Sequence, residues 1–227
     1  MQIRKIINKI NKSYRFHKFS GISFNSKKCK NGDIFFAIKG NKKNGSEFIN
    51  DAVSNGAKTI ISNQKYQGYK KDVLYLNSNN PRKLLSQVAN KIYNKKPNNI
   101  IAVTGTNGKS SIANFFFQIL TICNKKVASI GTLGINSSNY NLALPNTTLD
   151  PVNLNKILEE QKKKKIDDVI LEASSHGLKQ HRLDGINFKI GIFTNLSRDH
   201  LDYHKSYKDY FNSKMILFNK LMKKNSI

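Results

Sequence analysis

The sequence lacks the features that mark membrane, secreted and zinc-bound proteins. No apolar run in its 227 residues approaches the roughly 20 residues that span a bilayer. Residues 1–19 carry scattered charges and no apolar stretch before a small-residue cleavage site, so they read as neither a signal peptide nor an anchor. Cys29 and Cys123, the only two cysteines, lie far apart and lack the spacing of metal ligands. We therefore expect a cytoplasmic protein with reduced thiols.

Acidic and guanidinium groups are also scarce. Lys and Arg number 39 against 14 Asp and Glu, which gives a net charge of +25, yet 34 of the basic residues are Lys and only 5 are Arg. Guanidinium is the group best suited to bidentate recognition of phosphates and bases. The lysines are spread along the whole chain, together with 30 Asn. We therefore predict no nucleic-acid partner and assign to this charge only a modest attraction of phosphate-bearing substrates.

The chain divides at residues 94–99, a polar stretch that contains Pro97. Before this stretch, apolar patterning predicts strands at 34–38, 59–62 and 73–76, and helices at 47–54 and 81–93. After it, the pattern predicts strands at 100–104, 168–171 and 189–193, and helices at 109–123, from 151 onward with Asp150 as cap, and at 207–221. Strands that alternate with helices indicate an α/β fold with a parallel sheet. We expect one domain at 1–97 and part of a second at 98–227.

A glycine loop between a strand and a helix is the strongest chemical signal. Residues 101–110 read Ile-Ala-Val-Thr-Gly-Thr-Asn-Gly-Lys-Ser. The backbone N–H groups of such a loop, with the N-terminus of the next helix, bind phosphate oxygens. The pattern predicts that Lys109 reaches the β/γ-phosphates of ATP and that the Ser110 hydroxyl binds Mg²⁺. The predicted ATP site comprises Gly105, Thr106, Asn107, Gly108, Lys109, Ser110 and Ser111. The general pattern has Gly where this chain has Val103, and a tight strand-to-helix turn is the alternative.

Two further polar clusters follow predicted strands. Glu172 comes directly after the strand at 168–171, and ligands of parallel α/β sheets bind at the carboxyl ends of strands. Glu172 is therefore placed to hold a metal ion near bound phosphates. His200 lies in the segment 193–204, which concentrates imidazole and carboxylate groups. By itself Glu172 is as often a solvated loop residue as a ligand, and by itself the segment 193–204 is better interpreted as a capped loop. Together with the glycine loop, the two clusters favour a shared nucleotide–metal site.

Several longer segments resemble the Mur ligases. The loop at 105–110 is similar to the nucleotide loop of that family, and residues 24–28 and 31–40 are similar to its uridine-binding domain. Three segments resemble in particular the ligase that acts third: Leu-Pro-Asn-Thr-Thr at 144–148, Glu-Ala-Ser-Ser-His-Gly-Leu-Lys-Gln-His-Arg at 172–182, and Thr-Asn-Leu-Ser-Arg-Asp-His-Leu-Asp-Tyr-His at 194–204. The likeness implies a small uridine-binding α/β domain followed by a parallel-sheet ATP-binding domain with a phosphate loop.

The resemblance also implies residue roles. Ser26 would contact the uridine nucleotide, and Glu172 and His200 would join Ser110 as Mg²⁺ ligands. Lys109, His200 and Lys214 would be catalytic, with Lys214 carried as a carbamate, which requires a neutral amine and hence a lowered pKa. Binding of the UDP-muramoyl-dipeptide would fall to Asn146, Thr147, Thr148, Ser174, Gln180 and Arg182.

The reaction implied by the resemblance is ATP-dependent amide formation. ATP would phosphorylate the carboxylate of the D-glutamyl residue, and the amine of meso-diaminopimelate or L-lysine would attack the acyl phosphate. We expect Mg²⁺ as cofactor, ATP as co-substrate, a monomer and no membrane partner. The family continues beyond the point that corresponds to residue 227 into a C-terminal domain, so we expect this chain to be incomplete and unable to finish ligation alone.

Two alternatives stay open. Folylpolyglutamate synthetases share the short glycine loop, although the uridine-type N-terminal segment and the Asn-Thr-Thr segment argue against them. The chain could also be a module that binds UDP-muramoyl peptide or nucleotide without turnover.

Overall fold

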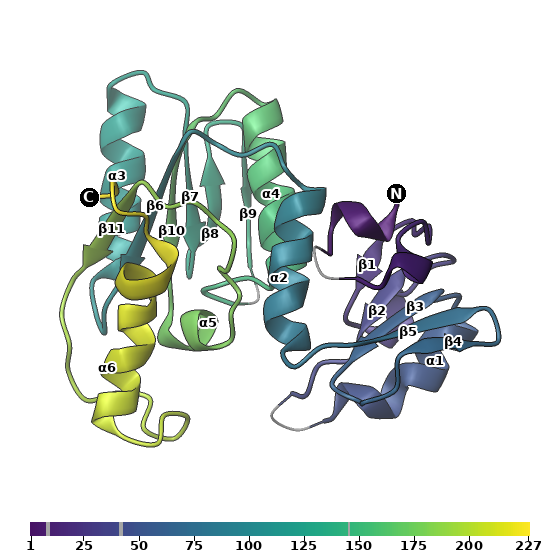
Figure 1. The fold of residues 1–227 in the computed structure, drawn as a ribbon. Coiled ribbons are helices and arrows are strands. Elements are labelled where there is room, and N and C mark those ends of the chain that lie inside the picture. The colour runs from purple at the N-terminus through teal and green to yellow at the C-terminus, as the bar shows by residue number, and fades with distance from the viewer. Residues whose placement is uncertain (8–9, 41–42, 145) are drawn as a thin grey trace. The chain divides into compact units, whose positions relative to one another are not determined.

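The computed structural model describes residues 1–7, 10–40, 43–144 and 146–227. The chain forms two compact units, Met1–Ile92 and Tyr93–Ile227, whose boundary precedes the polar stretch at 94–99. Each unit has its own sheet, as Figure 1 shows. Pro145, in the segment 144–148 that resembles the Mur ligases, lies outside the described residues.

Unit 1 is built around a five-stranded sheet. Its strands, in spatial order, are β1 (Ile22–Ser23), β2 (Ile34–Phe36), β3 (Thr59–Ser62), β5 (Val73–Asn77) and β4 (Gly68–Lys70). All neighbours are parallel except β4 and β5. Every residue of β2 and β3 is buried, as expected for parallel strands covered on both faces. The unit also contains α1 (Ile49–Ser54), α2 (Pro81–Ile92) and 3-10 turns at Ile3–Lys5, Lys12–Tyr14, Ser26–Lys28 and Gly45–Phe48.

Unit 2 is built around a six-stranded sheet. Its strands, in spatial order, are β11 (Ile190–Phe193), β6 (Asn99–Thr104), β10 (Asp168–Glu172), β7 (Val127–Gly131), β8 (Gly134–Ser137) and β9 (Tyr140–Leu142). The first four strands are parallel, and β8 and β9 extend the sheet with antiparallel pairs. Because β6 lies between β10 and β11, the segments that follow these three strands meet at one edge of the sheet.

The helices of unit 2 begin at identifiable caps. They are α3 (Lys109–Ile122), α4 (Pro151–Lys163), α5 (Ser175–Lys179) and α6 (Tyr207–Ile216), and α6 continues into a π-helical turn at Leu217–Leu221. Asp150, Ser174 and Ser206 each accept hydrogen bonds from backbone N–H groups in the first turn of α4, α5 and α6. The short α5 follows β10 and lies at the carboxyl end of the strands (Figure 1).

The α/β fold predicted from the sequence is confirmed, with three local corrections. The predicted helix at 47–54 is a 3-10 turn followed by α1, and the predicted helix at 207–221 is α-helical only to Ile216. Five strands, β1, β4, β7, β8 and β9, and the short helix α5 were not predicted. These strands are two to five residues long and include Gly, Ser and Asn, so they lack the apolar run that marks a strand in sequence.

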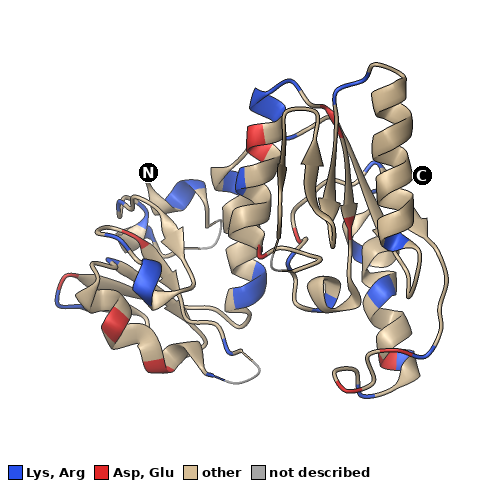
Figure 2. Ribbon diagram, turned by 180° about the vertical axis from the view of Figure 1, so that it is seen from behind, with Lys and Arg blue, Asp and Glu red and all other residues tan. Residues whose placement is uncertain are grey.

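Charge is dispersed rather than concentrated. Figure 2 shows Lys and Arg on helices and loops of both units. In the described part of the chain, no helix is both long enough and apolar enough to cross a membrane.

Candidate active site

The glycine loop joins β6 to α3 in a conformation that depends on its two glycines. Gly105 and Gly108 have φ angles of 149° and 84°, which side chains other than that of glycine rarely adopt. A Cβ atom at Gly105 would also collide with the side chain of Thr194, which follows β11. The same β11 segment holds the loop: Asn195 accepts hydrogen bonds from the backbone N–H groups of Thr106 and Asn107.

Two lysine amines converge on one carbonyl oxygen of this loop. Lys109 Nζ donates to Gly105 O at 2.9 Å and to Thr106 O at 2.7 Å, and Lys214 Nζ donates to Gly105 O at 2.7 Å. Lys214 is 1% exposed, and its amine lies 4.2 Å from the centre of the Tyr210 ring. Burial and the neighbouring Lys109 ammonium lower the pKa of Lys214 from 10.5 to about 7. Burial likewise lowers the pKa of Lys109, against the attraction of Glu172 and Asp199.

Glu172 presents a buried carboxylate beside the loop. It is 2% exposed and accepts hydrogen bonds from Ser110 Oγ at 3.0 Å, Thr132 N at 2.9 Å and Thr132 Oγ1 at 3.2 Å. Thr132 follows β7, and a Cβ atom at the preceding Gly131 would collide with the Glu172 carboxylate. The carboxylate is therefore surrounded closely by hydroxyl and N–H donors at the carboxyl edge of the sheet.

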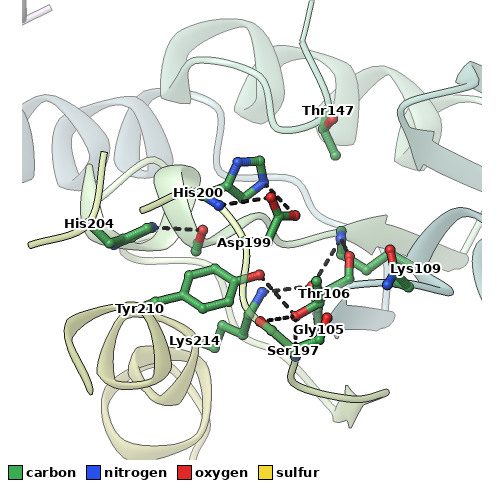
Figure 3. A network of polar contacts seen from close by, with 12 residues as sticks. Gly105, Thr106, Lys109, Thr147, Ser197, Asp199, His200, His204, Tyr210 and Lys214 are labelled. Carbon is green, nitrogen blue, oxygen red and sulfur yellow. Dashed lines mark hydrogen bonds and ion pairs between the residues drawn. The ribbon is translucent and has the colours of Figure 1, made fainter. Parts of the chain in front are cut away.

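These groups line one cavity of about 360 Å³. Figure 3 shows part of it, with the two lysines beside the loop and Thr147 opposite. Of the residues predicted from the sequence, the lining contains Thr106, Asn107, Gly108, Lys109, Ser110, Ser111, Thr147, Glu172, Ser174, His200 and Lys214. Residues from five separate segments thus meet in one place, as expected where parallel strands end.

The remaining predicted substrate residues divide into those next to the cavity and those away from it. Arg182 donates to the Thr148 carbonyl oxygen at 2.5 Å and to Gln180 Oε1 at 2.8 and 3.1 Å, and Thr148 Oγ1 bonds to Ser174 Oγ at 3.0 Å. This network connects three predicted residues to Ser174, which lines the cavity. Asn146 is exposed and does not line the cavity, whereas Gly105 contributes through its carbonyl oxygen. Ser26 belongs to unit 1, where it is buried at the start of a 3-10 turn.

His200 lies at the cavity in a left-handed backbone conformation, with a φ angle of 53°. Its side chain is 46% exposed and its Nε2 lies 3.5 Å from Asp199 Oδ2. The ring of His176 lies 5.0 Å from it, centre to centre. Burial lowers the pKa of His176 and of the nearby His204. Among the described residues, no group of three or more His, Cys, Asp or Glu side chains could hold a metal ion.

Three residues of the site were not predicted. Thr132 binds Glu172 and lines the cavity, Ser175 lines it beside Ser174, and Tyr210 lies behind the loop. Thr132 follows β7, so its position at the carboxyl end of a strand would have been a signal had that strand been predicted. Ser175 is adjacent to a predicted residue, while nothing in the local sequence marks Tyr210.

These features define an α/β protein with a phosphate-type glycine loop at the carboxyl edge of a parallel sheet. The family model of the Mur ligase middle domain matches residues 103–227, and the model described as the Mur ligase family, catalytic domain, matches residues 18–99. The chain belongs to the Mur ligase family, which confirms the resemblance recognised in its motifs.

The relatives point to one branch of this family. UDP-N-acetylmuramoyl-L-alanyl-D-glutamate--2,6-diaminopimelate ligase of Agrobacterium fabrum (strain C58) is 40% identical over 209 residues, which cover 92% of this chain and 42% of the relative. The ligase of the same name from Rickettsia montanensis is 42% identical over 209 residues, which cover 90% of this chain and 43% of the relative. The chain thus spans less than half the length of these curated relatives.

Solved structures agree with the sequence comparisons. A structure of a UDP-N-acetylmuramoyl-L-alanyl-D-glutamate--2,6-diaminopimelate ligase matches with a TM-score of 0.82 at 31% identity, over 98% of this chain and 46% of the other. The MurF ligase of Thermotoga maritima in complex with ADP matches with a TM-score of 0.60 at 19% identity, over 92% of this chain and 44% of the other, which shows the shared fold.

Proposed function

We propose that the chain forms the uridine-substrate and ATP-phosphate portions of a ligase that makes a peptidoglycan precursor. The reaction adds meso-diaminopimelate, or L-lysine, to UDP-N-acetylmuramoyl-L-alanyl-D-glutamate and yields ADP and phosphate. One observation carries the proposal: residues of the loop, of β10 and of α6 that the family resemblance names together line one cavity. The printed names of the relatives supply the substrate class, with diaminopimelate as the amino acid.

The chemistry begins with activation of a carboxylate. A carboxylate is a poor electrophile, so its oxygen attacks the γ-phosphorus of ATP, the bond to the β-phosphate oxygen breaks, and an acyl phosphate and ADP form. The loop N–H groups and Lys109 offset the phosphate charge during this step. The amine then attacks the acyl carbon, loses a proton and expels inorganic phosphate, which leaves an amide bond.

A magnesium ion fits the residues beside the loop. The Glu172 carboxylate and the Ser110 hydroxyl, 3.0 Å apart, are oxygen groups of the kind Mg²⁺ prefers. Ser110, Glu172 and His200 would hold the ion, which would neutralise charge on the phosphates. Thr132 orients the Glu172 carboxylate through two hydrogen bonds, and Gly131 leaves room for that carboxylate.

Lys214 is suited to carbamate formation. Only a neutral amine attacks CO₂, and a pKa of about 7 makes a large fraction of Lys214 neutral at physiological pH. The nitrogen lone pair forms a bond to the carbon of CO₂, one C=O π-bond pair moves to oxygen, and the nitrogen releases a proton. The product is an anion next to the Lys109 ammonium, so the repulsion between two cations becomes an attraction.

The peptide substrate is assigned to the opposite side of the cavity. Thr147 lies on that side, as Figure 3 shows, and Ser174 also lines the cavity. The Arg182 guanidinium bonds to the Thr148 carbonyl oxygen and to Gln180 Oε1. A planar guanidinium is suited to grip a carboxylate or phosphate of the UDP-muramoyl-dipeptide. Ser26 and Asn146 remain assigned to this substrate by resemblance alone.

Calorimetry with the 227-residue chain tests the proposal. We expect separate binding of MgATP and of UDP-N-acetylmuramoyl-L-alanyl-D-glutamate, and no binding of a folate monoglutamate. An ADP-release assay with both ligands then distinguishes the enzyme from a module without turnover, because a binding module releases no substrate-dependent ADP. Binding of the folate in place of the UDP-linked substrate would contradict the assignment and favour a folylpolyglutamate-synthetase-like ligase.

A further inference from the structure

Tyr210 lies beside both the glycine loop and Lys214 of α6, as Figure 3 shows. It is 1% exposed and is among the largest fully buried side chains. Its hydroxyl lies 3.1 Å from Thr106 Oγ1 in the loop, and its ring lies under the Lys214 amine at 4.2 Å. One side chain therefore contacts both the phosphate loop and Lys214.

The direction of the hydrogen bond between Tyr210 and Thr106 follows from the partners of Thr106. The Thr106 hydroxyl accepts from Ser197 N at 3.0 Å and lies 3.3 Å from Ser197 O, which can only accept. The single hydroxyl proton of Thr106 therefore goes to Ser197 O, and Tyr210 donates to Thr106. With these three bonds the Thr106 hydroxyl is fully satisfied.

The hydrogen bonds of Thr106 hold the glycine loop in one conformation before phosphate binds. Without them, the loop would have to adopt that conformation during binding. The backbone N–H groups of a glycine loop bind phosphate well only when they point at a common centre. A loop already held in that shape loses less conformational entropy on binding. Ser197 holds Thr106 from the segment after β11, and Tyr210 holds it from α6.

We infer that Tyr210 is a positioning residue that holds the glycine loop ready for nucleotide phosphate through Thr106. The inference rests on the proposed function, since it concerns the same ATP site. The conformation of the loop then depends on how α6, the helix that carries Lys214, packs against it. Tyr210 itself contacts no substrate.

Tyr210→Phe isolates the hydroxyl, because the phenylalanine ring can still lie beneath Lys214. We expect the Kd for MgATP to rise about three- to tenfold, the usual effect of losing one hydrogen bond. We expect the Kd for the UDP-muramoyl-dipeptide to stay unchanged. Thr106→Val removes the same bond from the loop side, so Tyr210→Phe should add nothing further in a Thr106→Val background.

Tyr140→Phe is the matched control. The Tyr140 hydroxyl on β9 accepts a hydrogen bond from Gln161 Nε2 at 2.9 Å, and Tyr140 does not line the cavity. Its loss should lower the melting temperature without changing the Kd of either ligand, whereas Tyr210→Phe should change the Kd of MgATP selectively. A purely structural role of Tyr210 would make the two variants alike.

The outcomes separate the inference from the function on which it rests. A wild-type chain that binds no MgATP refutes the proposed function and the inference together. Wild-type binding that Tyr210→Phe leaves unchanged, or a variant that weakens both ligands equally, overturns the inference alone. An additive effect in the Thr106→Val background also overturns it, because the bond between the two hydroxyls would then not be the cause.

Discussion

Replacing Lys214 by Met measures how much the buried amine lowers the free energy of unfolding. Lys214 is 1% exposed, and its amine contacts the Gly105 carbonyl oxygen and the Tyr210 ring. Burial, reinforced by Lys109, lowers its pKa from 10.5 to about 7. Met fills a similar volume without a charge, so Lys214→Met should relieve this penalty wherever the amine of the folded wild-type chain is protonated.

The expected magnitude follows from the pKa. A fall from 10.5 to about 7 corresponds to at most about 5 kcal/mol, at about 1.4 kcal/mol for each tenfold change. The lost hydrogen bond and ring contact offset about 1 kcal/mol each. We therefore expect Lys214→Met to be about 1–3 kcal/mol more stable than wild type near pH 6.

The sign of the pH dependence is fixed by linkage. Between about pH 7 and 10.5 the unfolded chain holds a proton on Lys214 that the folded chain has lost. The stability of the wild type therefore rises with pH across this window, and the advantage of Lys214→Met shrinks. Below pH 7 both states are protonated, and the full difference remains.

Urea denaturation in CO₂-free buffer at pH 6, 7, 8 and 9 measures this difference, because exclusion of CO₂ keeps Lys214 as an amine. Lys208→Met, at an exposed position of the same helix, is the control and should give a small difference at every pH. A Lys214→Met variant that is less stable than wild type at pH 6, or whose difference from wild type is the same at pH 6 and pH 9, would show that the amine is not buried at a cost.

Three further substitutions test the assigned roles. Lys109→Ala should weaken MgATP binding at least about tenfold with little change in melting temperature; unchanged binding in calorimetry would contradict the phosphate role of the loop. Arg182→Lys should raise the Kd of the UDP-muramoyl-dipeptide about tenfold, since it loses the planar fork, at nearly constant ATP affinity. Weaker ATP binding at constant affinity for the UDP-muramoyl-dipeptide would instead assign Arg182 to ATP. Glu172→Gln should raise the Mg²⁺ concentration that half-saturates ATP binding by about tenfold, and an unchanged Mg²⁺ titration would exclude Glu172 as a ligand.

Local sequence was sufficient where strand, loop and helix are continuous. The segment from β6 through the glycine loop into α3 was predicted because its apolar run, glycines and helix start lie within one short stretch. β3 was predicted with the bounds that the structure has, since all four of its residues are buried. The predicted end of the helix at 207–221 was wrong, because residues 217–221 form a π-helical turn. Such a turn has the apolar pattern of an α-helix but different backbone hydrogen bonds.

The contacts inside the site could not be predicted in the same way. The motifs indicated Glu172, but its partner Thr132 depends on which strand lies beside β10. Tyr210 contacts Thr106 across 104 residues of sequence. Such contacts depend on the order of the strands in the sheet and on how the helices pack against it, and neither can be inferred from a short stretch of sequence.

The strand order of unit 2 also sets the order in which the domain can fold. β6 lies between β10 and β11, and Asn99 bonds to Asp168 and Lys189 at sequence separations of 69 and 90 residues. During synthesis, the apolar β6 and the loop attached to it therefore leave the ribosome long before either neighbouring strand exists. Contacts between residues so far apart in sequence slow folding, and they lengthen the time for which the edges of β6 stay unpaired. The glycine loop is thus made early but acquires its final shape only after β10 and β11 have been made.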